Sequence, residues 1–143
     1  MAFGRSYNKY GNKKVEMDGI KFDSKVERDY FIYLKDKKAR GEITDIEVHK
    51  KFLLQDKFEQ HGKKYRAIHY EADFVITYNT GKQEAIDTKG AILTSEFILK
   101  AKIYRKLYGD EIPLRVIAYR HGEWIDFEEY LEELKKTKKK NKK

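Results

Sequence analysis

The chain has 143 residues, of which 40% are hydrophobic and 14% aromatic, enough for one folded core and hardly for two. Charged residues reach 39%, above the roughly 25% of an ordinary soluble domain. The absence of cysteine excludes disulfides, thiolate zinc sites and a cysteine nucleophile. No apolar segment has the length of a signal-peptide core or a membrane span, so we expect a cytoplasmic protein that does not enter membranes.

The net charge of +8 is distributed unevenly along the chain. Residues 1–14 carry four basic residues and no acid, and residues 135–143 carry seven lysines and no acid. The 15–134 stretch between them holds 21 basic and 24 acidic residues. Basic terminal segments favour a polyanionic partner, most commonly nucleic acid, although lysines can also serve solubility alone. We therefore expect a basic N-terminal arm at 1–14, one domain at 15–134 and a disordered lysine-rich tail at 135–143.

Apolar periodicity and turn residues predict a mixed α/β domain with a central sheet. Asp18-Gly19 and His61-Gly62 are typical of tight turns, and Pro113 interrupts the chain. The predicted elements, in chain order, are a hairpin at 15–22, a helix at 24–39, strands at 43–58, 65–78 and 83–89, a helix at 94–109, a strand at 114–119 and a helix at 126–136.

The loop Asn79-Thr80-Gly81 fixes an expected register between the strands around it. If Tyr78 pairs with Lys82, Asp73 lies opposite Asp87, with Cβ atoms about 5 Å apart. Because strand side chains alternate, Lys89 shares the face of the two acids. Two facing carboxylates repel each other, and a divalent cation with a preference for oxygen ligands, such as Mg²⁺, would relieve that repulsion.

A purely structural interpretation competes with this one. The two acids could mark the exposed face of an edge hairpin, and a D…DxK pattern alone is weak. Glu27, on the first predicted helix, can face inward with Phe31 and Leu34, but it also has capping-box spacing from Ser24. Either role of Glu27 is open from the residues alone.

With these residues in place, the chain resembles the PD-(D/E)XK nucleases, in which an acid on the first helix precedes a D…(D/E)xK hairpin and a further helix. The stretches FDSKVERDYFIYL, HYEADFVI and EAIDTKG are similar to a phage and prophage branch first catalogued as a domain of unknown function and thought to act like Holliday-junction resolvases. The resemblance covers about residues 8–110.

The resemblance implies a single restriction-endonuclease-like domain with a central mixed β-sheet flanked by helices. It implies that Asp73 and Asp87 bind metal, with the Thr88 carbonyl and Glu27 completing the ligand set. Lys89 becomes the catalytic lysine, so the implied catalytic residues are Glu27, Asp73, Asp87 and Lys89. The expected cofactor is Mg²⁺, with Mn²⁺ able to substitute and no small-molecule cofactor, in a DNA-associated protein of a bacterial host cell.

Two positions depart from the family pattern. Ala72 stands in place of the proline of the family name, which is common in the superfamily. His49 stands near the position where a glutamine is expected, which puts any inherited role for that position in doubt. A histidine in a charged strand is more often simply solvated, although its ordinary pKa suits proton transfer.

The chemistry of a phosphodiester suits these residues. A bound Mg²⁺ would polarise the phosphoryl oxygen, lower the pKa of a bound water and stabilise the leaving oxygen. Lys89 would orient the attacking water and neutralise charge that develops in the transition state. Basic residues outside this group are expected to hold DNA phosphates, unless they only form solvated surfaces. These residues are Lys9, Lys13, Lys14, Lys100, Lys102, Arg105, Lys106, Lys135 and Lys136.

The expected activity is Mg²⁺-dependent hydrolysis of DNA, selective for branched DNA such as four-way junctions. No base-reading motif is evident in the sequence, which favours recognition of shape over sequence. A transposase-type or restriction-like nuclease and a non-catalytic DNA-binding phage protein are the alternatives. Because a two-fold junction needs paired cuts and the chain has one candidate site, we expect a homodimer. The eleven tyrosines and eight phenylalanines offer material for its interface.

Overall fold

The computed structural model describes residues 14–141. The chain divides into two compact units, which we describe separately. Unit one comprises residues up to Tyr33, the short segment Thr88–Ile92 and the chain from Arg115 onward. Unit two comprises Leu34–Asp87 and Leu93–Leu114.

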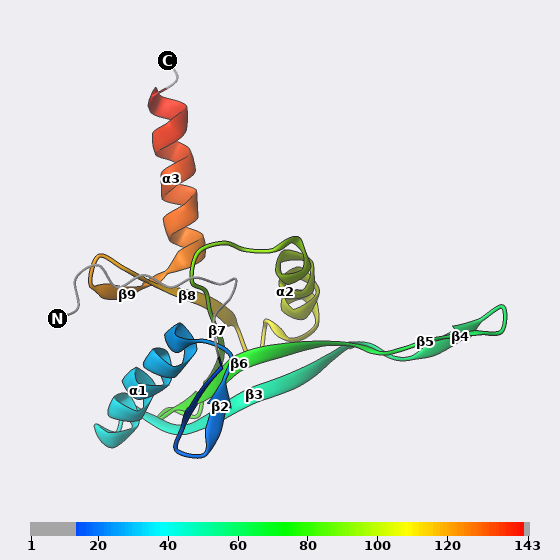
Figure 1. Cartoon of the computed structure of the whole chain (residues 1–143), viewed down its shortest axis with the longest axis horizontal. Coiled ribbons are helices and arrows are strands. Elements are labelled where there is room, and N and C mark those ends of the chain that lie inside the picture. The colour runs from blue at the N-terminus through cyan, green and yellow to red at the C-terminus, as the bar shows by residue number, and fades with distance from the viewer. Residues whose placement is uncertain (1–13, 142–143) are drawn as a thin grey trace. The chain divides into compact units, whose positions relative to one another are not determined.

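A five-stranded sheet has the strand order β3-β6-β7-β8-β9 (Figure 1). Its antiparallel pairs are β3–β6, β6–β7 and β8–β9. Between β7 and β8 the pairing is parallel, because Ala85 N–H donates to Pro113 O and Lys89 N–H donates to Ile117 O. The expected α/β class with a mixed central sheet is thus confirmed, and the arrangement is consistent with a restriction-endonuclease-like fold. The strands span Ile43–Gln55 (β3), Ile68–Tyr78 (β6), Gln83–Thr88 (β7), Leu114–Arg120 (β8) and Glu123–Asp126 (β9).

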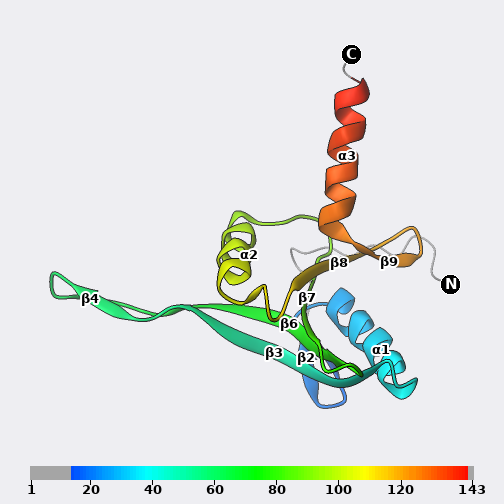
Figure 2. The ribbon, with the colours of Figure 1, turned by 180° about the vertical axis from the view of Figure 1, so that it is seen from behind.

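In unit two, helix α2 (Ser95–Tyr108) packs on the long β3–β6 hairpin. The ring of Tyr104 lies 4.9 Å from that of Phe52 on β3 and 5.3 Å from that of Tyr70 on β6. Tyr108 O–H also donates to Leu53 O at 2.6 Å. Past α2 the hairpin continues as a ribbon made of β4 (Phe58–Gln60) and β5 (Lys63–Tyr65), visible from both sides in Figures 1 and 2.

Unit one contains the hairpin β1–β2 (Val15–Met17 and Ile20–Phe22), the part of helix α1 (Lys25–Ala39) up to Tyr33, and the β8–β9 hairpin leading into α3 (Phe127–Asn141). Its core is aromatic, since the ring of Trp124 lies 4.9 Å from those of Tyr30 and Tyr119. A shallow pocket of about 330 Å³ is lined by Asp29, Ile32, Tyr33, Tyr119 and Trp124.

Three hairpins close through the same two-residue turn, in which a polar residue precedes glycine and both have positive φ. These turns are Asp18-Gly19, His61-Gly62 and His121-Gly122. Positive φ at both positions is the type I′ geometry, whose twist matches that of paired strands. The first two turns follow the sequence prediction, whereas β9, which begins after the third, was not predicted.

Several predicted boundaries differ from the structure. The strand expected at 43–58 ends at Gln55, and Phe58 begins a separate strand. The last helix, expected to end at Lys136, continues to Asn141, so 135–141 are helical where a disordered tail was expected. The basic N-terminal segment predicted at 1–14 lies outside the described residues except for Lys14, which is exposed.

Local interactions explain why α3 continues through the lysines. Lys135 pairs with Glu132 at 3.9 Å, and Lys136 pairs with Glu133 at 3.7 Å, each three residues away along the helix. Lysine is also a good helix former, and cations in a last turn interact favourably with the helix dipole. The expectation of disorder followed from the missing apolar face and left out these local terms.

Within residues 14–141, no helix combines the length and the apolar character needed to cross a membrane.

Candidate functional site

The paired strands β6 and β7 bring two carboxylates together in unit two. The observed register pairs Phe74 with Ile86 and Val75 with Ala85, which is the register predicted from the Asn79-Thr80-Gly81 loop. Continued by one residue, this register sets Asp73 opposite Asp87. Asp87 is buried and Asp73 half-buried. Asp87 therefore meets a second carboxylate in a region largely removed from water, where like charges repel strongly.

Tyr70 is bonded to Asp87 and was not identified from the sequence. Its hydroxyl donates to Asp87 Oδ2 at 2.6 Å, a length typical of a charge-assisted bond. Burial raises the pKa of Tyr70 far above its ordinary value, and the charge of Asp87, this hydrogen bond and the charge of Asp73 raise it further. The hydroxyl therefore stays protonated and holds one oxygen of Asp87 in a fixed direction. The sequence signal was only a tyrosine three residues before Asp73.

Thr88 and Lys89 follow Asp87 directly and begin the segment of unit one that pairs with β8. Lys89 N–H donates to Ile117 O at 2.8 Å, which fixes the backbone at this point. Both side chains are buried. A lysine is almost never fully buried without a charged or hydrogen-bonding partner. Its burial here distinguishes Lys89 from the exposed lysines that dominate the chain.

Glu27 lies in the first turn of α1, in unit one. Its backbone N–H donates to Ser24 Oγ at 3.2 Å, so the predicted capping role of Ser24 is confirmed. The Glu27 side chain is only 2% exposed, and its carboxylate lies within 4.8 Å of that of Asp23. A capping glutamate on a helix surface does not require such burial, which leaves room for a second role.

Burial separates the predicted catalytic residues from the rest of the polar chain. Across residues 14–141, the buried polar or charged residues are Glu27 (2% exposed), Asp87 (5%), Thr88 (8%) and Lys89 (9%). All four were selected from the sequence as metal-binding or catalytic residues. Every buried side-chain nitrogen and oxygen in this range has a hydrogen-bond partner. Asp87 in particular is held in a defined position by the hydrogen bond from Tyr70, as a functional site requires.

His49 occupies an unusual backbone conformation on β3. Its φ is +56°, in the left-handed region that few residues other than glycine adopt. Flanking pairs Val48–Phe74 and Lys50–Ala72 set His49 opposite Asp73 on β6. Strained backbone of this kind occurs often at functional sites. His49 was singled out in the sequence as a departure from a family pattern, with proton transfer weighed as a role, and its backbone gives a further reason to test it.

The donor set fits a hard divalent cation. Asp73 and Asp87 supply carboxylate oxygens, and the backbone carbonyl of Thr88 follows Asp87 in the chain. Mg²⁺ prefers oxygen ligands, commonly one or two carboxylates together with water and substrate phosphate. Neither sulfur nor a cluster of imidazoles is present at these positions, so the donor chemistry does not suit a softer metal.

Six of the nine basic residues expected to bind phosphate lie on two helices, α2 and α3. On α2, Lys102, Arg105 and Lys106 are exposed, while Lys100 is half-buried and pairs with Glu96 at 3.6 Å. The α2 N-terminus is capped by Thr94, whose hydroxyl accepts from Phe97 N–H at 3.1 Å. Positions 135 and 136 are exposed on α3, and positions 9 and 13 lie outside the described residues.

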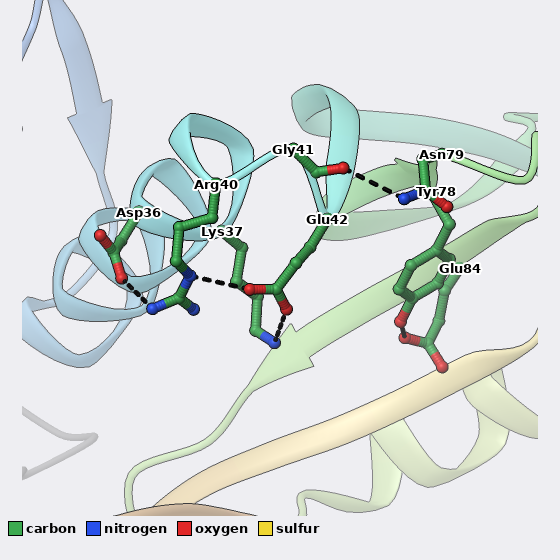
Figure 3. A network of polar contacts seen from close by, with 8 residues as sticks. All are labelled: Asp36, Lys37, Arg40, Gly41, Glu42, Tyr78, Asn79 and Glu84. Atoms are coloured by element: carbon green, nitrogen blue, oxygen red, sulfur yellow. Dashed lines mark hydrogen bonds and ion pairs between the residues drawn. The ribbon is translucent and has the colours of Figure 1, made fainter.

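A separate polar network joins the end of α1 to the β6–β7 turn (Figure 3). Glu42 accepts from Arg40 Nε at 2.8 Å and from Lys37 Nζ at 3.3 Å, and these bonds lower its pKa, with Arg40 the larger cause. Asn79 Nδ2 donates to Gly41 O at 3.1 Å. These ion pairs are exposed and contribute little energy. The hydrogen bond from Asn79 to Gly41 is the side-chain contact of this network that reaches the β6–β7 turn, which sets the register of Asp73 and Asp87.

The comparisons with known proteins give one match. Residues 7–121 match the family model described as "Protein of unknown function (DUF1064)". This range includes Glu27, Asp73, Asp87 and Lys89 and excludes α3. No curated protein and no solved structure is significantly similar to the chain.

Proposed function

The chain belongs to the DUF1064 family, whose function is unknown, and we propose that it is a Mg²⁺-dependent DNA endonuclease of the PD-(D/E)XK type. Its catalytic residues would be Asp73, Asp87, Lys89 and Glu27. The preferred substrate would be branched DNA, such as a four-way junction, cut by a homodimer.

One observation carries the proposal. Among the described residues, the buried polar or charged ones are four of the five selected from the sequence for metal binding and catalysis, the fifth being the half-buried Asp73. Burying a carboxylate or an ammonium is costly, and packing alone gives no reason to place several close along one chain segment. Buried ionisable groups are frequent at functional sites. A solvated edge hairpin, the structural alternative for the two acids, would leave Asp87 exposed.

Asp73, Asp87 and the Thr88 carbonyl would hold the metal, with Glu27 as a further acidic ligand. When bound, Mg²⁺ would supply Lewis acidity toward the phosphate and compensate the charge of the leaving oxygen. Without a cation, the negative charge of the two carboxylates would repel an anionic phosphate. This donor set therefore predicts that DNA cleavage depends strictly on a divalent ion.

The remaining chemistry falls to the side chains of this chain. Tyr70 keeps Asp87 in one orientation through its 2.6 Å hydrogen bond. Lys89 would hold the attacking water and neutralise charge on the phosphate in the transition state, where such a contact is most effective. An ammonium that is partly removed from water would be screened less, which strengthens its effect on the phosphate charge.

Cleavage of defined substrates tests the proposal. The protein would be incubated with linear duplex, flap and four-way-junction DNA, each with Mg²⁺, Mn²⁺ or EDTA, and the products separated on a denaturing gel. We expect cleavage in Mg²⁺ and Mn²⁺, none in EDTA, and faster cleavage of the junction. A protein that binds these substrates in EDTA yet cuts none of them with either ion would be a DNA-binding module instead.

Site variants decide whether cleavage belongs to this site. Asp73→Asn, Asp87→Asn and Lys89→Ala should each lower the rate by at least about 1,000-fold, because the groups act as a unit. The asparagine variants should still bind DNA, since each removes a negative charge near phosphate. The matched control is Glu84→Gln, which neutralises another acid of β7 and should cut at close to the wild-type rate. Wild-type cleavage by either asparagine variant would refute the site.

A further inference from the structure

The ribbon formed by β4 and β5 buries almost nothing. Of residues 56–67, which we call the arm, all are exposed except the half-buried Ala67. Figures 1 and 2 show this ribbon beyond the part of the β3–β6 hairpin that α2 covers. A two-stranded ribbon without a packed face is at best marginally stable in water. Its presence needs a reason other than the core of unit two.

The charge of the arm opposes that of the sequence around it. Lys57, Lys63, Lys64 and Arg66 outnumber Asp56 and Glu59, giving the arm a net charge of +2. The remainder of 15–134 has 17 basic and 22 acidic residues, a net charge of −5. The arm is thus a local cationic segment in an otherwise acidic stretch. A second copy of the same arm would be repelled by it, whereas a polyanion would be attracted.

Two aromatic rings are displayed to solvent on one face of the arm. Phe58 and Tyr65 are paired across the strands, with ring centroids 4.7 Å apart and planes within 9° of each other. Their exposed fractions are 45% and 38%. Lys63 Nζ lies 5.3 Å from the centre of the Tyr65 ring, on the same side of the ribbon. Aromatic rings beside cations form the usual surface for stacking nucleic-acid bases next to phosphates.

We propose that the arm is a DNA-binding element, in which its four cations contact phosphates and the Phe58–Tyr65 pair stacks on bases that are unpaired or unstacked. The proposal rests on the proposed function, since it names how the nuclease would recognise branched DNA. A β-ribbon has the width to enter a major groove, and a branch point offers bases that a regular duplex keeps stacked.

Binding measured in EDTA tests the cations without cleavage. The variant Lys57→Gln/Lys63→Gln/Lys64→Gln/Arg66→Gln should bind fluorescein-labelled junction DNA on the order of 10-fold more weakly at 0.1 M salt, with a shallower salt dependence. The matched control, Lys21→Gln/Lys25→Gln/Lys35→Gln/Lys38→Gln, loses the same charge from exposed positions of β2 and α1. Equal loss of DNA affinity in both variants would show that only the net charge of the protein matters. That result would refute a DNA-binding role specific to the arm.

A tryptophan placed in the arm tests base stacking directly. Trp124 is the one tryptophan of the chain, so Phe58→Trp adds a single reporter whose signal is obtained by subtracting the wild type. We expect junction or single-stranded DNA to quench this reporter, and blunt duplex to quench it less. No quenching at saturating junction DNA would overturn the stacking role.

The two proposals can fail separately. A protein that cuts DNA in Mg²⁺ but shows no arm quenching is a nuclease with a different binding surface. Quenching in EDTA together with absent cleavage in every metal would instead support the arm and refute the nuclease.

Discussion

Removing the Tyr70 hydroxyl tests whether Asp87 is held for metal binding. Tyr70→Phe deletes one oxygen from a side chain that is 3% exposed and leaves the ring contacts with Phe97 and Tyr104 in place. The lost interaction is a 2.6 Å hydrogen bond to a buried carboxylate. Water cannot easily replace the hydroxyl at this depth, so Asp87 would lose a donor without compensation.

Loss of this hydrogen bond should change both the unfolding free energy and the affinity for Mg²⁺. Hydrogen bonds to charged groups contribute about 1.5–3 kcal/mol, so the unfolding free energy without metal should fall by that amount. At about 1–3 kcal/mol per molar urea, the unfolding midpoint would shift by roughly 1 M. Partners that orient metal ligands contribute about 10- to 100-fold to metal affinity, so Mg²⁺ binding should weaken within that range.

Tyr78→Phe provides the matched control. Tyr78 O–H donates to Glu84 Oε1 at 2.7 Å, so the deleted group and the acceptor type are the same (Figure 3). Glu84 is half-buried and lies outside the proposed site. Urea unfolding in EDTA and calorimetric titration with Mg²⁺ and Mn²⁺ would compare the two variants. The control should lose less stability, because water reaches Glu84, and should keep its metal affinity.

Equal behaviour of the two variants would refute a specific role for the Tyr70 hydroxyl at Asp87. Unchanged metal affinity in Tyr70→Phe would mean that Asp87 is not a ligand or needs no orientation. An equal loss of metal affinity in Tyr78→Phe would trace the effect to general destabilisation of β6 and β7. A stability loss confined to Tyr70→Phe, with metal affinity unchanged, would limit the hydrogen bond from Tyr70 to a role in stability.

Four further predictions address other parts of the chain. Glu27→Gln should lower the cleavage rate by about 100-fold or more at a nearly unchanged melting temperature. Ser24→Ala should lower the unfolding free energy by about 1 kcal/mol and keep activity, because Ser24 only caps α1. An active Glu27→Gln variant would leave Glu27 with a structural role. Deleting 135–143 should weaken DNA binding and flatten its salt dependence without changing the melting temperature of the rest, and unchanged affinity would contradict a role in binding. Burial, with a smaller contribution from Tyr108, raises the pKa of Tyr104 to about 12. The native state therefore retains a proton that the unfolded state loses near pH 10, so unfolding free energy should fall between pH 10 and 12, and by less in Tyr104→Phe. Light scattering with and without junction DNA should give a dimer mass, and a monomer that resolves junctions fully would refute the homodimer.

The local parts of the site could be predicted from the sequence because short-range rules determine them. A three-residue loop ending in Gly81 fixed the β6–β7 register, and that register placed Asp73 opposite Asp87. Ser24 caps α1 as its spacing from Glu27 indicated. Each of these features depends on residues close together in the chain or on one turn whose geometry has few alternatives.

Features that depend on distant partners were missed. The bond from Tyr70 to Asp87 joins residues 17 positions apart, and the sequence shows only that a buried tyrosine needs an acceptor. The left-handed backbone of His49 has no signal in the residue type. Strand β9 did have a local signal, the turn His121-Gly122, but only four residues follow it before α3. The sequence did not indicate that β4 and β5 form a ribbon separate from β3, because these two short strands have no buried face that would produce a periodic pattern.

Helix α3 is a charge-segregated rod, with Glu128, Glu129, Glu132 and Glu133 in its first half and lysines filling its second. From Glu132 onward every described residue of this helix is exposed, so the coil-to-helix balance of this part is a local equilibrium, largely uncoupled from the melting of the core. Neighbouring lysines repel one another, and bound anions would relieve that repulsion. The helical length of this segment should thus respond to its ionic surroundings, shortening in dilute buffer at low pH and extending when a polyanion neutralises it.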